Sequence, residues 1–350
     1  MDVRAGVEAT QKSAQIGADS EVGQFPPIQG QPQSHAAIVA ILIPMRTALV
    51  IPSLGAPHLE RCLDAVAALD PAPDLKVLVL SGSAVAPSRS DGFNVRRHRD
   101  RLGFAAAVNA GISVLPGDVE SVAVLNDDAL PDPGWFGALA RALEDDPELA
   151  AVQGTVVTDD HRVIDGRGIA FDRWGLPVQI DRGLEIDDDQ GARPVLAISG
   201  TAGLYRMDAL LHAALPDSEI FDQRFDCYHE DLDLGLRLFR LGRRALWIGG
   251  ARTLHLGSAS GPSLRWRHPW WVLANRWRAL AGNLSPSALF GALPRLLRGE
   301  IRAIRTLGRR NWRALPAAAA VAAVFPLLVA GGWRRQTPGP RLDTIPGIPQ

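Results

Sequence analysis

Residues 121–128 read Ser-Val-Ala-Val-Leu-Asn-Asp-Asp, an apolar run that ends in an amide and two carboxylates. A short run of β-branched and apolar residues is typical of a buried strand. The strand would present Asn126, Asp127 and Asp128 at its carboxyl end, where α/β sheets bind their ligands. Carboxylate oxygens at such an edge suit Mg²⁺, which takes one or two carboxylates together with substrate phosphates. An ordinary solvated turn is the alternative, because Asp and Asn are common turn residues.

Strand-like and helix-like segments alternate on both sides of this run. Strands are expected near 46–52, 77–80 and 151–157, and helices at 57–69, 104–114 and 135–143. Alternation at this spacing indicates an α/β fold with a mostly parallel sheet covered by helices on both faces. The first strand is not followed by Gly-x-Gly-x-x-Gly, and the sequence has no Gly-Lys-Ser/Thr loop. Dinucleotide-binding and P-loop classes are therefore disfavoured.

A second group of acids lies in the sequence Tyr-His-Glu-Asp-Leu-Asp-Leu at 228–234. The helix dipole favours acids in a first turn, so a helix is expected to begin here. Asp233 could pair with Arg237 one turn further on, which leaves Glu230 and Asp231 less well explained. A carboxylate in this place could act as a general base toward a hydroxyl group.

His255 follows the strand-like segment 245–248. A single histidine is more often structural than a metal ligand. Beside Asp128, however, an imidazole nitrogen would favour a borderline metal such as Mn²⁺ over Mg²⁺. Both roles are open from the residues alone.

The composition excludes several classes of protein. The 350 residues are 47% hydrophobic, which is ample for a large core and rules out a mainly disordered or collagenous chain. Only Cys62 and Cys227 occur, so a disulfide framework is also excluded. With 37 basic against 38 acidic side chains, the net charge of −1 argues against bulk binding of nucleic acid.

Five short stretches, taken in order, resemble the motifs of family 2 glycosyltransferases. They are 50–53 (Val-Ile-Pro-Ser), 102–111 (Leu-Gly-Phe-Ala-Ala-Ala-Val-Asn-Ala-Gly), 125–128, 198–202, and 221–260, which contains Asp222, Glu230, Asp231, Arg237, His255 and Ser260. The resemblance runs from about residue 48 to residue 284. Within the family, the chain looks most like the rhamnosyltransferase-type enzymes of bacterial surface polysaccharide assembly.

The resemblance implies a GT-A fold and inverting transfer of a sugar from a nucleotide diphospho-sugar, such as dTDP-rhamnose or a UDP-sugar. Asp128 and His255 match the positions that hold Mg²⁺ or Mn²⁺ on the diphosphate. Asp231, beside Glu230, matches the catalytic base. By the same match the donor-binding residues are Pro52, Ser53, Ser81, Asn109, Asn126, Asp127 and Arg276, and the acceptor-binding residues are Gly200, Trp270 and Trp271. The two tryptophans could equally pack against a membrane or the core.

The chain departs from the family pattern at Arg101, where the family often has Asn, and at two places that bear on the donor. Residues 79–83 read Val-Leu-Ser-Gly-Ser, where the family usually has an Asp that contacts the nucleobase. The choice among UDP-, dTDP- and GDP-sugars therefore stays open. Ala274 stands where the family often has Arg, so Arg276 is expected to take over the diphosphate contact.

The sequence is expected to have three parts. Residues 1–44 read as a disordered polar leader, with Met45 as the natural start of translation. Residues 45–284 form the glycosyltransferase domain, and 285–350 form a helical tail. The stretch 265–341 contains fourteen Arg and one acid, Glu300, so its surplus of about thirteen positive charges leaves the rest near −14.

The tail is expected to meet a membrane. On a helix, the apolar residues Leu296, Leu297, Ile301, Ile304 and Leu307 lie on one side, opposite Arg298, Arg302, Arg305 and Arg309. Such a basic amphipathic helix lies in an anionic membrane interface, although a solvated helix docked on the catalytic domain is the alternative. Residues 314–333 are uncharged and long enough to span a bilayer. Their Ala and Pro content favours interfacial or re-entrant association instead.

These observations predict a bacterial glycosyltransferase at the cytoplasmic face of the cell membrane. Its acceptor would be a lipid-linked or cell-envelope glycan, and no nucleic acid or particular oligomeric state is predicted. A transferase acting on polyprenyl phosphate is one alternative. A catalytically silent GT-A scaffold or glycan-binding subunit is another, although it would have no reason to keep Asp128, Asp231 and His255.

Overall fold

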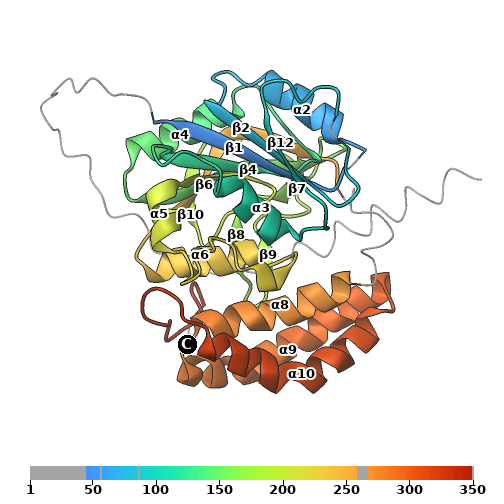
Figure 1. The fold of residues 1–350 in the computed structure, drawn as a ribbon. Helices are drawn as coiled ribbons and strands as arrows, with labels where there is room; N and C mark the ends of the chain where they lie inside the picture. The colour runs from blue at the N-terminus through green and yellow to red at the C-terminus, as the bar shows by residue number, and fades with distance from the viewer. Residues whose placement is uncertain (1–44, 56, 86, 258–266, 349–350) are drawn as a thin grey trace, which may run out of the picture.

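The computed structural model describes residues 45–55, 57–85, 87–257 and 267–348. The predicted leader at 1–44 and Ser260 lie outside the described residues. The described chain forms a sheet flanked by helices, with a layer of three long helices below it (Figure 1).

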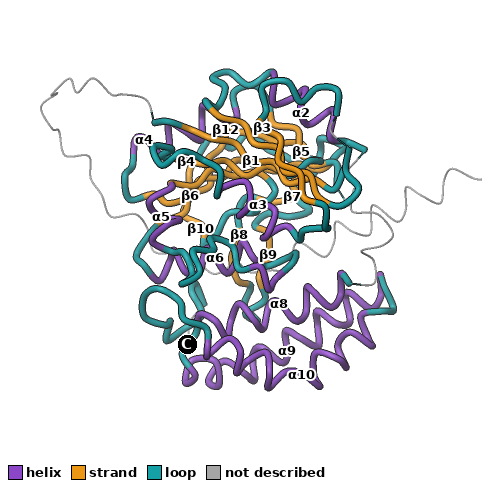
Figure 2. The backbone as a smooth tube through the Cα atoms, viewed as in Figure 1, coloured by secondary structure: helices purple, strands orange, loops and turns teal. Residues whose placement is uncertain are grey.

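The main sheet has ten strands, coloured orange in Figure 2, and eight of them follow the order β10-β12-β6-β11-β4-β1-β2-β3. Their bounds are β1 (Thr47–Ser53), β2 (Leu75–Ser81), β3 (Asn94–His98), β4 (Ser121–Leu125), β6 (Leu149–Thr158), β10 (Ala192–Val195), β11 (Ala202–Arg206) and β12 (Arg244–His255). Two more, β5 (Ala129–Pro131) and β7 (Ile164–Gly166), pair with β12 and β6, while β8 (Ile169–Phe171) and β9 (Pro177–Gln179) form a separate hairpin. The β4-β1-β2-β3 half is parallel, which confirms the predicted α/β fold with a mostly parallel sheet.

Both faces of the sheet are buried, because the central strands β1 and β4 are mostly apolar and every one of their residues is buried. Along β1, Ala48 and Val50 join a cluster on the side of α3 (Phe104–Ile112). Leu49 and Ile51 join a cluster on the opposite side, with α2 (Leu59–Ala67) and α4 (Trp135–Asp145). Alternate side chains of a strand point to opposite faces, so one apolar run supplies both cores.

Two strand ends carry the predicted site residues to the same edge. β4 lies between β1 and β11, and its carboxyl end continues into 126–128. β12 runs parallel to β6, shifts register between Trp247 and Arg252, and then pairs with β5, which places His255 opposite Ala129. The sequence pattern at 245–248 therefore marks only the first part of a twelve-residue strand.

The lower layer consists of α8 (His268–Asn283), α9 (Pro286–Arg310) and α10 (Ala314–Arg334). Their apolar residues form a third cluster, to which α6 (Glu230–Arg240) contributes Leu232 and Leu236. The predicted boundary at residue 284 falls inside this layer. Helix α8 lies before the boundary, yet it packs with α9 and α10, which lie after it. The short helix α5 (Met207–His212) lies on the sheet.

The predicted apolar face of α9 is divided between the protein and its surface. Leu296 is buried, and Ile304 and Leu307 pack on the helical cluster. Leu297 and Ile301, by contrast, are 48% and 50% exposed. Helix α9 therefore both packs on the neighbouring helices and exposes apolar side chains at the surface.

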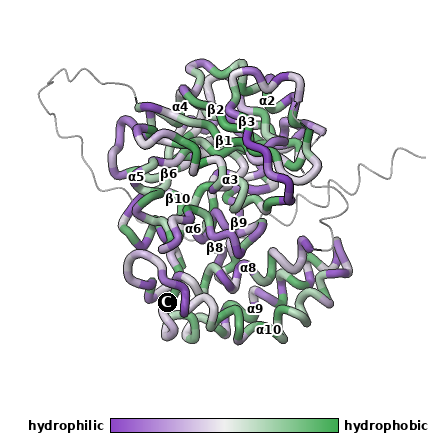
Figure 3. Tube along the Cα trace, in the orientation of Figure 1, coloured by the Kyte–Doolittle hydropathy of each residue, from purple (hydrophilic) through white to green (hydrophobic). Residues whose placement is uncertain are grey.

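Helix α10 is continuous through Pro326 and is strongly hydrophobic (Figure 3). Among the described helices, it is the one long and apolar enough to cross a membrane, with a mean hydropathy of 2.1 over its most apolar 18 residues and 17% of that window buried. One such helix is weak support for a span, since a core helix can pass the same test.

The packing of α3 on β1 gives a test of the fold. A Cβ on Gly111 would lie 2.3 Å from Cγ1 of Val50, whereas a Cβ on Gly291 of α9 would meet nothing within 4 Å. We expect Gly111→Ala to lower the free energy of unfolding by roughly 1–3 kcal/mol through overpacking. Gly291→Ala should raise it by up to about 1 kcal/mol through helix propensity. Denaturant unfolding checks both, and equal stability of the two variants would contradict the packing.

Candidate active site

The carboxyl ends of β1 and β4 bring two predicted residues into contact. The strands are parallel neighbours, so Ser53 at the end of β1 lies beside the segment after β4. Ser53 Oγ donates a hydrogen bond to Oδ2 of Asp127 at 2.5 Å and accepts one from the backbone N–H of Gly55 at 2.9 Å. Asp128 is 6% exposed. Residues Asn126, Asp127 and Asp128 therefore form a largely buried group beside the end of β1, which we call the acidic edge.

His255 lies between two carboxylates. Its Nε2 is 3.4 Å from Oδ1 of Asp128, and its Nδ1 is 2.8 Å from Oδ2 of Asp165, which also pairs with Arg182 at 3.0 Å. Burial would lower the pKa of His255, but the hydrogen bonds and charges of Asp128 and Asp165 raise it to about 9. Asp165 was not predicted, because it lies 90 residues from His255 in the sequence.

The donor atoms of Asp128 and His255 fit a divalent cation that is completed by a ligand. Within the described ranges, no group of three or more His, Cys, Asp or Glu side chains is placed to hold a metal alone. An oxygen and an imidazole nitrogen suit Mn²⁺, and Mg²⁺ and similar cations usually keep part of their shell for substrate phosphates. Asp165 holds the other ring nitrogen, as carboxylates commonly do for ligating histidines.

The predicted acids at 230–233 do begin a helix, α6, and two of them form a second site. Oδ1 of Asp231 accepts a hydrogen bond from the N–H of Leu232 at 2.7 Å, and Oδ2 accepts one from the N–H of Gly200 at 3.1 Å. Glu230 is buried, and its Oε2 has no hydrogen-bond partner among the described residues. Burial raises the pKa of both carboxyls, and the charge of Asp231 raises that of Glu230 further.

Gly200 is confined as well as bonded to Asp231. A Cβ there would lie 2.9 Å from Cζ of Phe104. The next residue, Thr201, accepts a hydrogen bond through its carbonyl oxygen from the N–H of Asn126, at 2.8 Å. The loop at 199–201 therefore connects the acidic edge after β4 with the acids of α6.

The loop before α6 has an unusual backbone. Asp226, Tyr228 and His229 all have positive φ values, of 57°, 69° and 69°. Such values are uncommon for residues other than glycine and need support from their surroundings. Asn275 of α8 supplies part of it, since its Nδ2 donates to the carbonyls of Phe225, Cys227 and Tyr228 at 2.7–3.0 Å.

His229 ties the same loop to α8. Its Nε2 lies 3.2 Å from the carbonyl oxygen of Val272, so a neutral ring with the proton on Nε2 can donate there. Burial, with a further contribution from Arg276, lowers the pKa of His229 to about 3. The imidazole is therefore neutral across the physiological pH range.

Tyr228, in the loop before α6, packs against two aromatic side chains of α8. Its side chain is 39% exposed, and its ring meets those of His268 and Trp271 with centroids 4.9 and 6.3 Å away. Its pKa is raised to about 12 by burial, and the charges of Glu230 and Asp128 add to the shift.

Five predicted residues also have contacts within the protein. Asn109 is bonded reciprocally to the backbone of Phe221, donating at 2.7 Å and accepting at 2.9 Å. Arg276 is buried and paired with Glu300 of α9. Ser81 accepts from the N–H of Leu102 at 3.3 Å, and Trp271 is 5% exposed, with Trp270 half-buried against the helical cluster.

Comparison with known proteins gives one family match. Residues 48–212 match the family model described as Glycosyl transferase family 2. The match includes the acidic edge but ends before Asp231 and His255. A comparison with curated proteins gives no significant match.

Several solved structures are similar to this chain. The crystal structure of GalNAc-T7 with UDP, GalNAc and Mn²⁺ aligns with a TM-score of 0.52 and 12% identity, over 70% of this chain and 49% of that one. The mannosyltransferase PcManGT from Pyrobaculum calidifontis, in complex with GDP-Man and Mn²⁺, aligns with a TM-score of 0.46 and 18% identity, over 93% and 86%. S. aureus TarS gives 0.42 and 14%, over 68% and 42%. This chain thus spans about half the length of GalNAc-T7, and the similarity shows the expected GT-A type of fold.

The neutral state of His229 gives a pH test. A histidine whose pKa falls from about 6.5 unfolded to about 3 folded stabilises the protein fully above pH 6.5, and this stability is lost as the pH falls toward 3. At pH 5.5 the loss should be about 1.4 kcal/mol relative to pH 7.5. The His229→Gln variant, whose amide can still donate to Val272, should lose less of its free energy of unfolding over the same pH interval, because it lacks the imidazole. Denaturant unfolding at both pH values measures this, and equal losses would refute it.

Proposed function

We propose that this chain, whose residues 48–212 match the model of glycosyl transferase family 2, is an enzyme of that family and transfers a sugar from a nucleotide diphospho-sugar to a hydroxyl group, with inversion. The observation that carries the proposal is the pairing of two sites across the 199–201 loop. One is the Asp128–His255 pair, and the other is Asp231 held by the N–H of Gly200. A site for the diphosphate beside a carboxylate that can take up a proton is what displacement at an anomeric carbon by a hydroxyl requires.

Asp231 is the proposed general base. Burial raises its pKa, which strengthens it as a proton acceptor toward a sugar hydroxyl. The two hydrogen bonds from backbone N–H groups fix the direction of its carboxylate. Asp231 accepts two hydrogen bonds, which favour its ionised form, whereas Oε2 of Glu230 has no hydrogen-bond partner among the described residues.

Asp128 and His255 would hold the divalent cation, Mg²⁺ or Mn²⁺. Bound there, the cation would neutralise the charge that develops on the departing diphosphate. The two ring nitrogens of His255 contact Asp128 and Asp165, one each. Asp165 keeps the ring oriented, and Ser53 keeps Asp127 at the edge of the site.

The donor is proposed from chemistry and from the similar proteins, which were solved with UDP or with GDP-Man. The segment 79–83 lacks an acid for the nucleobase, so UDP-, GDP- and dTDP-sugars, including dTDP-rhamnose, all belong in a test panel. Asn126 and Asp127 remain the proposed donor contacts, together with Pro52, Ser53 and Ser81.

The helical layer is proposed to bind the cytoplasmic face of the cell membrane. Six large apolar side chains on α9, on α10 and between them are exposed: Phe290, Leu297, Ile301, Trp312, Leu315 and Leu327. Arg298, Arg302, Arg305 and Arg309 are exposed on α9 as well. Exposed apolar groups beside arginines suit an anionic bilayer interface. A lipid-linked or cell-envelope glycan is then the proposed acceptor, with polyprenyl phosphate as the alternative.

The role of Asp231 is tested by Asp231→Asn, with the exposed Asp217→Asn as the matched control. We expect Asp231→Asn to lower kcat for release of nucleoside diphosphate by roughly 10²–10⁴-fold, because an amide cannot accept the proton. The donor KM should change little. The assay uses the donor panel with Mn²⁺ and membrane extract as a source of acceptor. A kcat equal to that of Asp217→Asn would exclude Asp231 as the base.

Membrane binding is tested by replacing Arg298, Arg302, Arg305 and Arg309 together with Gln. Each arginine near an anionic surface contributes about 1 kcal/mol, so binding should weaken by at least about tenfold. The control replaces four exposed arginines of the sheet domain, namely Arg96, Arg97, Arg99 and Arg141. Cosedimentation with phosphatidylglycerol vesicles at low salt measures the effect. Equal loss in both variants would show that α9 is not the binding face.

A further inference from the structure

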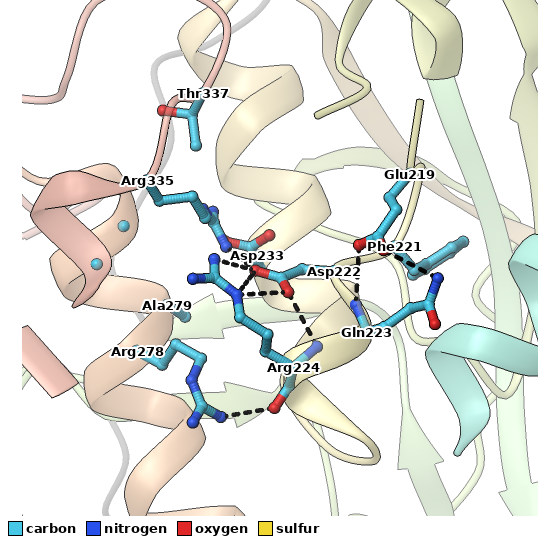
Figure 4. Close-up of polar contacts among 12 residues, drawn as sticks. Glu219, Phe221, Asp222, Gln223, Arg224, Asp233, Arg278, Ala279, Arg335 and Thr337 are labelled. Atoms are coloured by element: carbon cyan, nitrogen blue, oxygen red, sulfur yellow. Dashed lines mark hydrogen bonds and ion pairs between the residues drawn. The ribbon is translucent and has the colours of Figure 1, made fainter. Parts of the chain in front are cut away.

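Arg335 follows the last residue of α10 and reaches from the helical layer to the catalytic layer (Figure 4). Its Nη1 donates to Oδ2 of Asp222, and its Nη2 donates to Oδ1 of Asp233 at 2.5 Å. The side chains of all three residues are 5% exposed or less. One guanidinium fork therefore joins two buried carboxylates that come from different segments.

The two carboxylates stand on either side of the catalytic acids. Asp222 precedes the turn η1 (Gln223–Phe225), and Asp233 lies in the first turn of α6, two residues after Asp231. Between them lies the loop with positive φ at Asp226, Tyr228 and His229. Because such a backbone is unfavourable by itself, both of its ends must be held for Asp231 to keep its place.

The charges around the fork show that it is stabilised as an ionised group. Burial would raise the pKa of Asp233, but Arg335 and Arg237 hold it below its usual range. Burial acts in the same way on Asp222, and Arg224 and Arg335 lower its pKa to about 2. Asn283 also donates to Oδ1 of Asp233, at 2.9 Å. Without Arg335, Asp222 would keep the half-exposed Arg224 as its partner, and Asp233 would keep Arg237. The two carboxylates would then have no shared partner.

The position of Arg335 is set by the helical layer. A Cβ on Gly332 of α10 would lie 2.7 Å from the Cβ of Ala281 in α8, so the two helices are in close contact. Arg341 donates to carbonyls at the ends of both helices, including Gly282 at 2.9 Å and Trp333 at 2.9 Å. Arg240 of α6 donates to Thr337 at 2.9 Å. The end of α10 is therefore fixed on both α8 and α6.

We propose that Arg335 is a positioning residue for sugar transfer, which uses the helical layer to hold the segment 222–233 and thereby Asp231 in place. The inference rests on the proposed role of Asp231 as the base. Arg335 itself does not touch the reacting groups. Its fork acts on Asp222 and Asp233, and they fix the two ends of the catalytic loop.

The test compares Arg335→Met with Arg334→Met, its exposed neighbour on the same turn. In Arg335→Met we expect kcat for release of nucleoside diphosphate to fall by roughly ten- to a hundredfold, with donor KM within about threefold of wild type. Arg335→Lys keeps the charge but not the fork, so its kcat should lie between the two. Arg334→Met should equal wild type.

Hydrogen exchange of the full chain gives a second readout that does not need turnover. Amides of 223–234 should exchange at least about tenfold faster in Arg335→Met than in Arg334→Met, while those of β1 and β2 stay unchanged. If wild type transfers no sugar, the proposed function fails, and exchange still decides whether Arg335 orders the loop. Should Arg335→Met not fold, Arg335→Lys against Arg334→Lys carries the same comparison. Equal exchange and equal kcat in a matched pair would overturn the inference.

Discussion

Two buried carboxylates, Glu230 and Asp233, and the partly buried carboxylate of Asp231 between them set the main constraint on this molecule. Burying a carboxylate is costly unless it is neutralised or paired. Glu230 and Asp231 have pKa values raised by burial, whereas Asp233 stays ionised beside Arg237 and Arg335. One helical turn thus carries acids suited to proton transfer together with an acid that anchors the turn. The loop before α6 and the helical layer below it both serve that arrangement.

The two layers divide the work of the site. The sheet brings Asp128 and His255 together from the ends of β4 and β12, where an anionic ligand and its cation would bind. The helical layer supports the other half through Asn275 and Arg335, which hold the catalytic loop and the start of α6. The same layer exposes the apolar and basic side chains that we propose to bind the membrane. The support of the proposed base and the proposed membrane-binding face therefore belong to one layer.

The local parts of the site could be predicted from the sequence, because strand and helix signals are local. The run at 121–128 has the apolar pattern of a central strand, and the acids at 230–233 match a helix start. Asp165, Asn275 and Arg335 gave no such signal. Their contacts with His255, Cys227 and Asp233 span 90, 48 and 102 residues, and only the topology brings them together. Arg276 had suitable chemistry for a diphosphate, but burial pairs it with Glu300.

The most direct test of the central claim is calorimetric titration of the protein with UDP, GDP and dTDP, with and without Mn²⁺. If Asp128 and His255 form the cation site for a diphosphate, at least one nucleotide will bind at least about tenfold more tightly with Mn²⁺ in the wild type. Asp128→Asn will lose that dependence while staying folded. Affinities that are unaffected by Mn²⁺ for all three nucleotides, or equal dependence in wild type and Asp128→Asn, would contradict the account.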